Sequence, residues 1–221
     1  MTASGWARVS GAMGIPFVVA YVLILALTGS SPSDTSSDTK IMNYYGSHSH
    51  RVRDLTVFFI AIAGAALFLW FLGHLRALLR SAEGPGARAA GVAVASGTAF
   101  ITLFVVTGCA YTAASFVVSD AGSKFTLDPN TFRLVSGVGT LVYIGAFVLA
   151  APLAFAVGVV AWRTRVLPRW LAVLSFLAGI GCLGGIVFVP SWIEMIWILV
   201  LSIYLAVRPA GRPAGAAPAT A

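Results

Sequence analysis

The chain has 221 residues, of which 59% are hydrophobic and only 10% are charged. Soluble domains carry about 25% charged residues, so a fold with water on all sides is excluded. The net charge of +7 alone would suit nucleic acid. The basic residues, however, form short clusters between long uncharged runs, and this distribution favours a membrane surface and predicts no nucleic-acid partner.

The uncharged runs cover residues 9–33, 55–73, 89–119, 134–162 and 170–207, the last of which is interrupted only by Glu194. A helix needs about 20 apolar residues to cross the hydrocarbon core of a bilayer, so each of the first four runs predicts one span. The fifth run is too long for one helix and has Pro190 near its midpoint, which predicts a hairpin of two short helices.

The expected fold is therefore an all-α, polytopic integral membrane helical bundle with six transmembrane helices. The spans are predicted at about 9–29, 53–73, 90–117, 134–162, 169–188 and 191–207, within a single membrane domain 1–207. Residues 208–221 are rich in Pro, Ala and Gly and are expected to form a disordered cytoplasmic tail.

The basic residues divide unequally between the two sides of this topology. One side holds nine of them: Arg8, Arg76, Arg80, Arg88, Arg163, Arg165, Arg169, Arg208 and Arg212. The other side holds five: Lys40, Arg51, Arg53, Lys124 and Arg133. The positive-inside rule then places both termini in the cytoplasm and the protein in the cell membrane.

Arg76 and Arg80 lie one turn apart at the inner end of the second span and are expected to contact anionic lipids of the inner leaflet. Arg8 with the apolar stretch after it also resembles a signal peptide. That stretch is long for a signal sequence and no clear cleavage site precedes Ser30, so we expect the first span to be retained.

Three smaller features bear on packing. Pro152 predicts a kink in the fourth span. Gly181 and Gly185 form a G-x-x-x-G pair that allows close helix approach, within one chain more readily than between two chains. Cys109 and Cys182 both fall in outer halves of spans, so a disulfide is conceivable, but two unpaired small residues are the simpler interpretation.

Polar side chains gather on the outer side. After Asp38, helical spacing places Ile41, Tyr44, Tyr45 and His48 on one face and predicts an amphipathic stretch that leads into the second span, with His48 toward protein. We expect the outer ends of the second, fourth and sixth spans to converge. The predicted outer-face polar pocket consists of Tyr44, His48, Arg51, Arg53, Asp54, Arg133 and Glu194.

Glu194 is the member of this group whose position is energetically least favourable, because an ionised carboxylate within a bilayer is costly. A shared polar pocket lowers the cost of burying it. Glu194 is therefore predicted to meet at least one of the basic side chains His48, Arg51, Arg53 and Arg133.

No motif identifies a reaction. The chain lacks G-x-S-x-G, a Walker loop and the zinc signature H-E-x-x-H, and the spacing of His48 and His50 is not specific for a metal. We predict no metal site and no cofactor, and the catalytic residues, if the protein is an enzyme, cannot be named from the sequence.

Three segments carry a resemblance: Tyr44-Tyr45-x-x-His48-x-x-Arg51, the run FLWFLGHLRALLRSAEG at 68–84, and VLPRWLAVLSFLAGIG at 166–181. Together they resemble uncharacterised six-span membrane proteins of high-GC bacteria, of the DUF4386-like type. The resemblance implies a six-helix bundle and confers no catalytic residues. The central segments of the chain are shorter than is usual for that type.

Three functions remain open. The favoured one is a non-enzymatic membrane protein that binds a lipid or a partner helix, including a second copy of itself. The first alternative is a small proton-coupled carrier that uses Glu194. The second is a membrane-embedded enzyme acting on a lipid-borne substrate, with Glu194 as acid or base and His48 as its proton partner.

Overall fold

The structure is a computed structural model that describes residues 3–184 and 189–207, and within these ranges it contains helices and no strand. The all-α prediction is confirmed. The α-helices are α1 (Ala3–Ala12), α2 (Gly14–Thr28), α3 (Asp38–Gly46), α4 (His48–Glu83), α5 (Arg88–Ala121), α6 (Pro129–Thr164), α7 (Arg169–Leu183) and α8 (Val189–Val207), with a short 3-10 helix, η1 (Gly122–Lys124).

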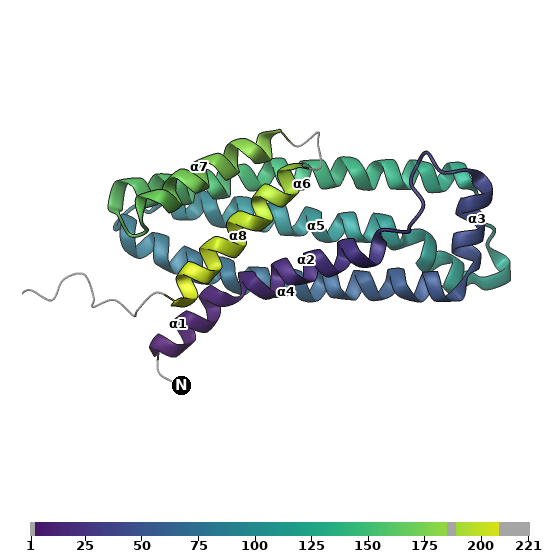
Figure 1. The fold of residues 1–221 in the computed structure, drawn as a ribbon, viewed down its shortest axis with the longest axis horizontal. Coiled ribbons are helices and arrows are strands. Elements are labelled where there is room, and N and C mark those ends of the chain that lie inside the picture. The colour runs from purple at the N-terminus through teal and green to yellow at the C-terminus, as the bar shows by residue number, and fades with distance from the viewer. Residues whose placement is uncertain (1–2, 185–188, 208–221) are drawn as a thin grey trace, which may run out of the picture.

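Three long helices form the frame of the molecule. α4 and α6 have 36 residues each and α5 has 34, so each is about 50 Å long at 1.5 Å per residue. They lie side by side, with α5 in contact with both α4 and α6 (Figure 1). The hydrocarbon core of a bilayer is about 30 Å thick, so these helices are long enough to extend beyond it.

Within the described residues, four segments are long and apolar enough to cross a membrane: Arg8–Thr28, His48–Glu83, Arg88–Ala121 and Pro129–Thr164. They correspond to the first four predicted spans. α7 and α8 are apolar but shorter, with 15 and 19 residues, and they pack against each other as a hairpin would. Their crossing of the membrane stays a prediction. The predicted disordered tail 208–221 and Gly185 lie outside the described residues.

The remaining helices cover the frame unevenly. α7 packs on α6, whereas α2 packs on α4. α8 begins near the middle of the bundle and runs obliquely toward α1 (Figure 1). Gly14 permits this crossing, because a Cβ atom there would lie only 2.0 Å from Oγ of Ser202 on α8. Gly181 plays the same role between α7 and α8, where it faces Ile193, in agreement with packing inside one chain.

α3 lies across one end of the bundle (Figure 1). Its N-terminus is capped by Ser37, whose Oγ accepts a hydrogen bond from the backbone N–H of Lys40 at 3.3 Å. One face of α3 packs into an apolar cluster that closes this end, formed by Ile41, Tyr44, Tyr45, Leu127 and Phe132. We call this the α3 end of the molecule.

A serine of α5 supports α6 next to Pro152. Ser96 is buried, its hydroxyl donates to the carbonyl oxygen of Leu149, and its Oγ accepts from the backbone N–H of Leu153 at 2.9 Å. A proline inside a helix removes one backbone donor and crowds the preceding turn. The Ser96 hydroxyl thus joins two backbone groups that flank the proline, where no water is at hand to satisfy them.

We expect Ser96→Ala to lower the free energy of unfolding by about 1 kcal/mol, the upper part of the range measured for hydrogen bonds between membrane helices. Chemical or thermal unfolding of the purified protein in detergent measures this loss. Ser81→Ala is the matched control, because Ser81 is exposed and bonds only to its own helix. Equal effects of the two substitutions would contradict the supporting role of Ser96.

Candidate functional site

At the α3 end, the phenol of Tyr44 is the centre of a buried polar network. Tyr44 donates to Oδ1 of Asp54 at 2.8 Å, and its oxygen receives a hydrogen bond from Nη2 of Arg53 at 2.8 Å. The hydroxyl of Ser31 lies 2.8 Å from the same oxygen. Since the one phenolic proton goes to Asp54, Ser31 must act as the donor in this contact.

The carboxylate of Asp54 is held from two elements. Ser115 of α5 donates to Oδ2 at 2.6 Å, while Tyr44 of α3 holds Oδ1. Burial raises the pKa of the Tyr44 phenol, against the opposing effect of its hydrogen bonds from Ser31 and Arg53. The phenol therefore stays protonated at neutral pH and remains a donor. The network ties α3 to α4 and α5.

His50 covers the other side of the same ring. Its imidazole stacks on Tyr44 with ring centroids 4.4 Å apart, and its Nδ1 lies 3.3 Å from the backbone oxygen of Tyr44. His48 is exposed at the first position of α4, so the prediction that His48 faces the protein is wrong. The physical reason is a break at Ser47, whose ψ of 122° ends α3 and restarts the helix in a new phase. Asp54 then turns inward and Val52 outward.

Arg51 and Arg53 of α4, both assigned to the predicted polar pocket, bind different partners. Arg51 donates from Nη1 to the backbone oxygens of Tyr45 at 2.6 Å and Gly46 at 3.1 Å, and from Nε to Ser119 at 3.1 Å. It therefore caps the last carbonyls of α3 and joins them to the end of α5. Arg53 instead binds the phenol of Tyr44.

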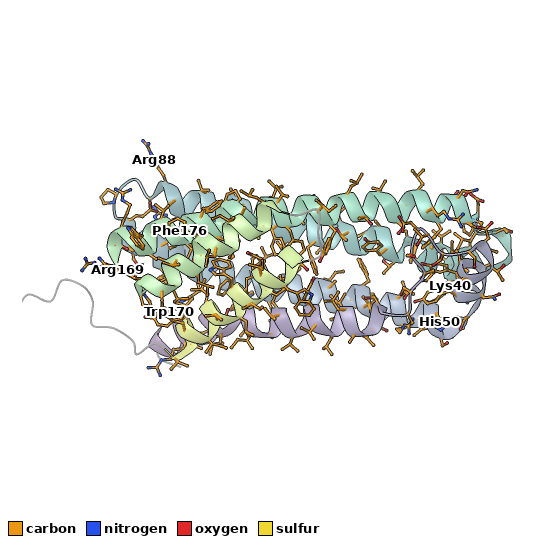
Figure 2. The ribbon with its side chains drawn as sticks, turned by 45° about the horizontal axis from the view of Figure 1, so that its top comes forward. Lys40, His50, Arg88, Arg169, Trp170 and Phe176 are labelled. Atoms are coloured by element: carbon orange, nitrogen blue, oxygen red, sulfur yellow. The ribbon has the colours of Figure 1, made fainter. Side chains whose placement is uncertain are left out.

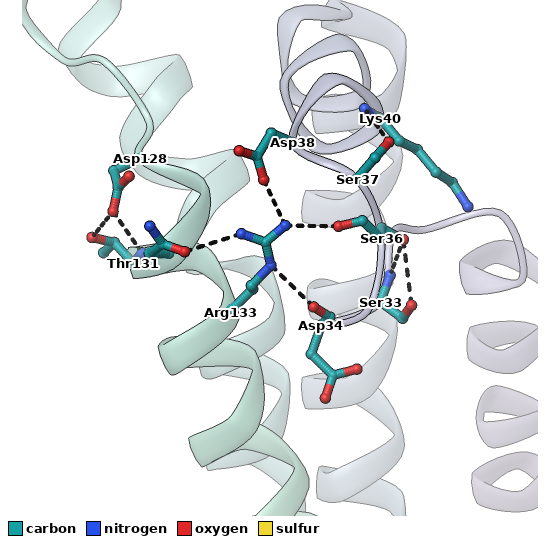
Figure 3. A network of polar contacts seen from close by, with 10 residues as sticks. Ser33, Asp34, Ser36, Ser37, Asp38, Lys40, Asp128, Thr131 and Arg133 are labelled. Atoms are coloured by element: carbon teal, nitrogen blue, oxygen red, sulfur yellow. Dashed lines mark hydrogen bonds and ion pairs between the residues drawn. The ribbon is translucent and has the colours of Figure 1, made fainter.

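Arg133 of α6 fixes the loop between α2 and α3 (Figure 3). Its guanidinium donates to Oδ1 of Asp38 at 2.6 Å and to the backbone oxygens of Ser36 at 2.8 Å and Asp34 at 3.1 Å. Asn130 accepts a further bond at 3.1 Å. All of its partners come from the chain itself, so the role of Arg133 at this position is to anchor α3.

Glu194 does not join this group. It lies in α8, is fully buried, and Oε2 accepts a hydrogen bond from the Cys182 thiol at 3.2 Å. Among the described residues, Oε1 of Glu194 has no hydrogen-bond partner. The one ion pair within these residues joins Arg133 to Asp38 and does not involve Glu194. The prediction that Glu194 meets His48, Arg51, Arg53 or Arg133 is therefore wrong.

The reason lies in the position of α8. It packs on α7, α1, α2 and α6 and begins near mid-bundle, well short of α3 (Figure 1). Tyr44, Arg53 and Asp54 come together as predicted, and Arg51 and Arg133 bind close to them through backbone groups of α3 and its loop. The proposed enzymatic pairing of Glu194 with exposed His48 receives no support from this arrangement.

Several partners in these sites were missed by sequence reasoning. Ser31 and Ser115 stand in weakly patterned stretches. No spacing signal links Ser31 to Tyr44, 13 residues away, or Ser115 to Asp54, 61 residues away along the chain. Cys182 is a free cysteine that only the α7–α8 contact brings to Glu194. Helical periodicity identifies faces of one helix and cannot pair faces of two helices.

The opposite end of the molecule, which we call the arginine end, carries six exposed arginines without an ion pair within the described ranges. They are Arg76, Arg80, Arg88, Arg163, Arg165 and Arg169. Glu83 is the acidic residue nearby, and its two carboxylate oxygens accept from the backbone N–H groups of Ala89 and Ala90 at 3.2 and 2.8 Å. It thus caps α5 and does not neutralise an arginine.

A hollow of about 340 Å³ lies beside these arginines between α6 and α7, lined by Trp162, Val173, Phe176 and Leu177. All four lining residues are apolar. The guanidinium of Arg169 lies 5.9 Å from the centre of the Trp162 ring, a cation–π distance that holds the charge beside one of the residues that line the hollow. Arg169 and Phe176 lie at the same end of the molecule as Arg88, and Lys40 and His50 at the other (Figure 2).

Comparison with known proteins gives no relative: no family model, curated protein or solved structure matches the chain. The resemblance to DUF4386-like proteins therefore stays a prediction.

We expect Tyr44→Phe to cost about 1–3 kcal/mol of unfolding free energy, because it leaves the buried Asp54 without one of its two donors. In a double-mutant cycle with Asp54→Asn, the two substitutions should show a coupling of at least about 0.5 kcal/mol. Tyr111→Phe is the control, since the Tyr111 hydroxyl bonds the exposed Thr140 and its loss leaves no buried charge without a donor. Additive effects of the Tyr44 and Asp54 substitutions would show that the network does not act as a unit.

Proposed function

We propose that this protein binds anionic membrane lipids at its arginine end. The observation that carries the proposal is the open apolar hollow between α6 and α7 with Arg169 held against Trp162, one of its lining residues. An acyl chain matches the lining of the hollow, and a phosphate headgroup matches the charge beside it. The polar group at the α3 end is a weaker candidate, because its members bind one another.

Charge supports the choice of an anionic lipid. Six exposed arginines gather at this end, and the one acidic side chain among them, Glu83, is occupied by the backbone of α5. Each basic residue near a negatively charged membrane surface contributes about 1 kcal/mol to its attraction. Trp162, near the end of α6, and Trp170, near the start of α7, are both exposed. Exposed aromatic residues of this kind are typical of a membrane interface.

The proposed orientation follows from the same residues. With the arginine end toward the cytoplasm, the anionic leaflet faces the six arginines and α3 lies outside. A cell membrane and cytoplasmic termini belong to this proposal. They are supported by the charge distribution and by the four helices able to cross a membrane.

Cysteine accessibility tests the orientation. In a Cys109→Ser background, which removes the exposed native thiol, Thr39→Cys on α3 should react with a membrane-impermeant maleimide in intact cells. Ala77→Cys should react only after the membrane is opened. Both positions are exposed, so neither depends on local unfolding. The reverse pattern would place the arginine end outside and contradict the proposed leaflet.

Lipid binding is tested with Arg163→Gln and Arg169→Gln combined. Loss of two charges should weaken binding of phosphatidylglycerol by about 30-fold, at about 1 kcal/mol per residue, and leave phosphatidylcholine unaffected. Native mass spectrometry of the detergent-purified protein with each lipid added measures both. The control combines Lys40→Gln and Lys124→Gln, which removes the same charge from exposed positions at the α3 end.

Leu177→Trp tests the contribution of the hollow to lipid binding separately from that of the arginine charges. A larger side chain in the hollow should weaken binding of both lipids while the preference for phosphatidylglycerol persists. If the arginine pair and the lysine pair change binding equally, the attraction is a property of net charge. The proposed site would then be wrong.

A further inference from the structure

Lipid binding at the arginine end does not explain why the carboxyl group of Glu194 is buried. It lies in the first half of α8 and is 0% exposed. The Cys182 thiol donates to Oε2, and Oε1 has no partner among the described residues. No basic side chain in the described part of the chain lies within ion-pairing distance of it. An apolar side chain would fill this position at a lower free-energy cost, so a buried acid here indicates a functional role.

Three of the helices that pack on α8 bring a titratable side chain to its first turns. α7 contributes Cys182, which bonds Glu194; α2 contributes Tyr21, whose ring lies against Trp192; and α6 contributes Tyr143, which bonds Ser191. The hydroxyl oxygens of Tyr21 and Tyr143 lie 2.8 Å apart, and Ser191 hydrogen-bonds to both phenols. Ser191 precedes Glu194 by three residues, so the two side chains share one face of α8.

α1 adds no charge near Glu194. It meets α8 through Gly11, next to Leu205 in the last turns of that helix, about three turns beyond Glu194. Arg8 is the ionisable side chain of α1 and is exposed. The surroundings of Glu194 therefore supply hydroxyl and thiol groups and no compensating cation.

We propose that Glu194 is a proton-binding site inside the bundle, which exchanges its proton through the hydroxyl groups of Ser191, Tyr21 and Tyr143. A carboxylate with one weak thiol donor and no cation is poorly stabilised in an apolar interior, whereas the neutral acid is tolerated there. Binding adds one proton to the carboxylate. On release the carboxyl proton passes to a hydroxyl oxygen while that hydroxyl gives its own proton to the next oxygen, so each hydroxyl ends neutral and one proton moves in total.

The hydroxyl groups continue from Tyr143 toward the α3 end. Thr140 and Ser136 lie three and seven residues before Tyr143 on α6, on the same helix face. Oγ1 of Thr140 lies 3.0 Å from the hydroxyl of Tyr111, which is 42% exposed. Hydroxyl groups thus recur from the Tyr21–Tyr143 pair along α6 toward the α3 end, which is the direction from which we expect protons to arrive.

Infrared spectroscopy of the full chain in detergent tests the proposal. The unaltered protein should show a protonated carboxyl band that shifts in D₂O and disappears at alkaline pH, and Glu194→Gln should lack this band. Glu83→Gln is the matched control and should retain it, because Glu83 is a partly exposed carboxylate that caps α5. Tyr143→Phe should slow the D₂O shift several-fold, whereas Tyr204→Phe, near the other end of α8, should not.

If no Glu194-dependent band is seen at any pH, Glu194 is ionised throughout. If the band is present but neither shifts in D₂O nor responds to pH, its proton does not exchange. Either result overturns the proposal. If Glu194→Gln fails to fold, a hydrophobic carbodiimide, which reacts with protonated carboxyl groups in apolar surroundings, is applied to the unaltered chain. Peptide mapping should then find the adduct on Glu194, and an unmodified Glu194 would overturn the proposal as well.

Discussion

If the four long apolar helices cross a membrane as proposed, polar groups between them must find partners within the protein, because the hydrocarbon core holds no water to bind them. The requirement is visible wherever polar atoms are buried. Ser96 joins backbone groups beside Pro152, and Ser175 accepts from the indole N–H of Trp197 at 2.9 Å. These contacts link α5 to α6 and α7 to α8, so the same bonds that satisfy polar groups also fix which helices pack together.

The two ends of the molecule meet this requirement differently. At the α3 end, charged groups are bonded within the chain: Asp54 has two hydroxyl donors, and Arg133 binds Asp38 and the loop before it. Such networks stabilise one arrangement of the chain and leave few groups for a ligand. At the arginine end the guanidinium groups have no acidic partner in the described ranges. Unneutralised charge beside an apolar hollow is the arrangement that suits an external anionic lipid.

Three buried polar atoms depart from the rule. Nε of Arg53, Oε1 of Glu194 and Oγ of Ser202 have no hydrogen-bond partner within residues 3–184 and 189–207. Arg53 keeps one bond through its Nη2, to the phenol of Tyr44. Ser202 has a packing explanation, since it fills the space left by Gly14. Glu194 has none, and a carboxyl group costs far more to bury than a hydroxyl. For this reason a site of proton exchange is argued from Glu194 and not from Ser202.

The sequence by itself determined the helical class, the four long apolar helices, and the grouping of Tyr44, Arg53 and Asp54, because run length and local spacing are properties of neighbours along the chain. Only the tertiary structure decided where Glu194 lies and which face of α4 turns inward. The break at Ser47 resets the helical phase by a single backbone angle, and the oblique path of α8 separates Glu194 from the α3 end. Both depend on contacts between distant segments, which periodicity within one helix cannot specify.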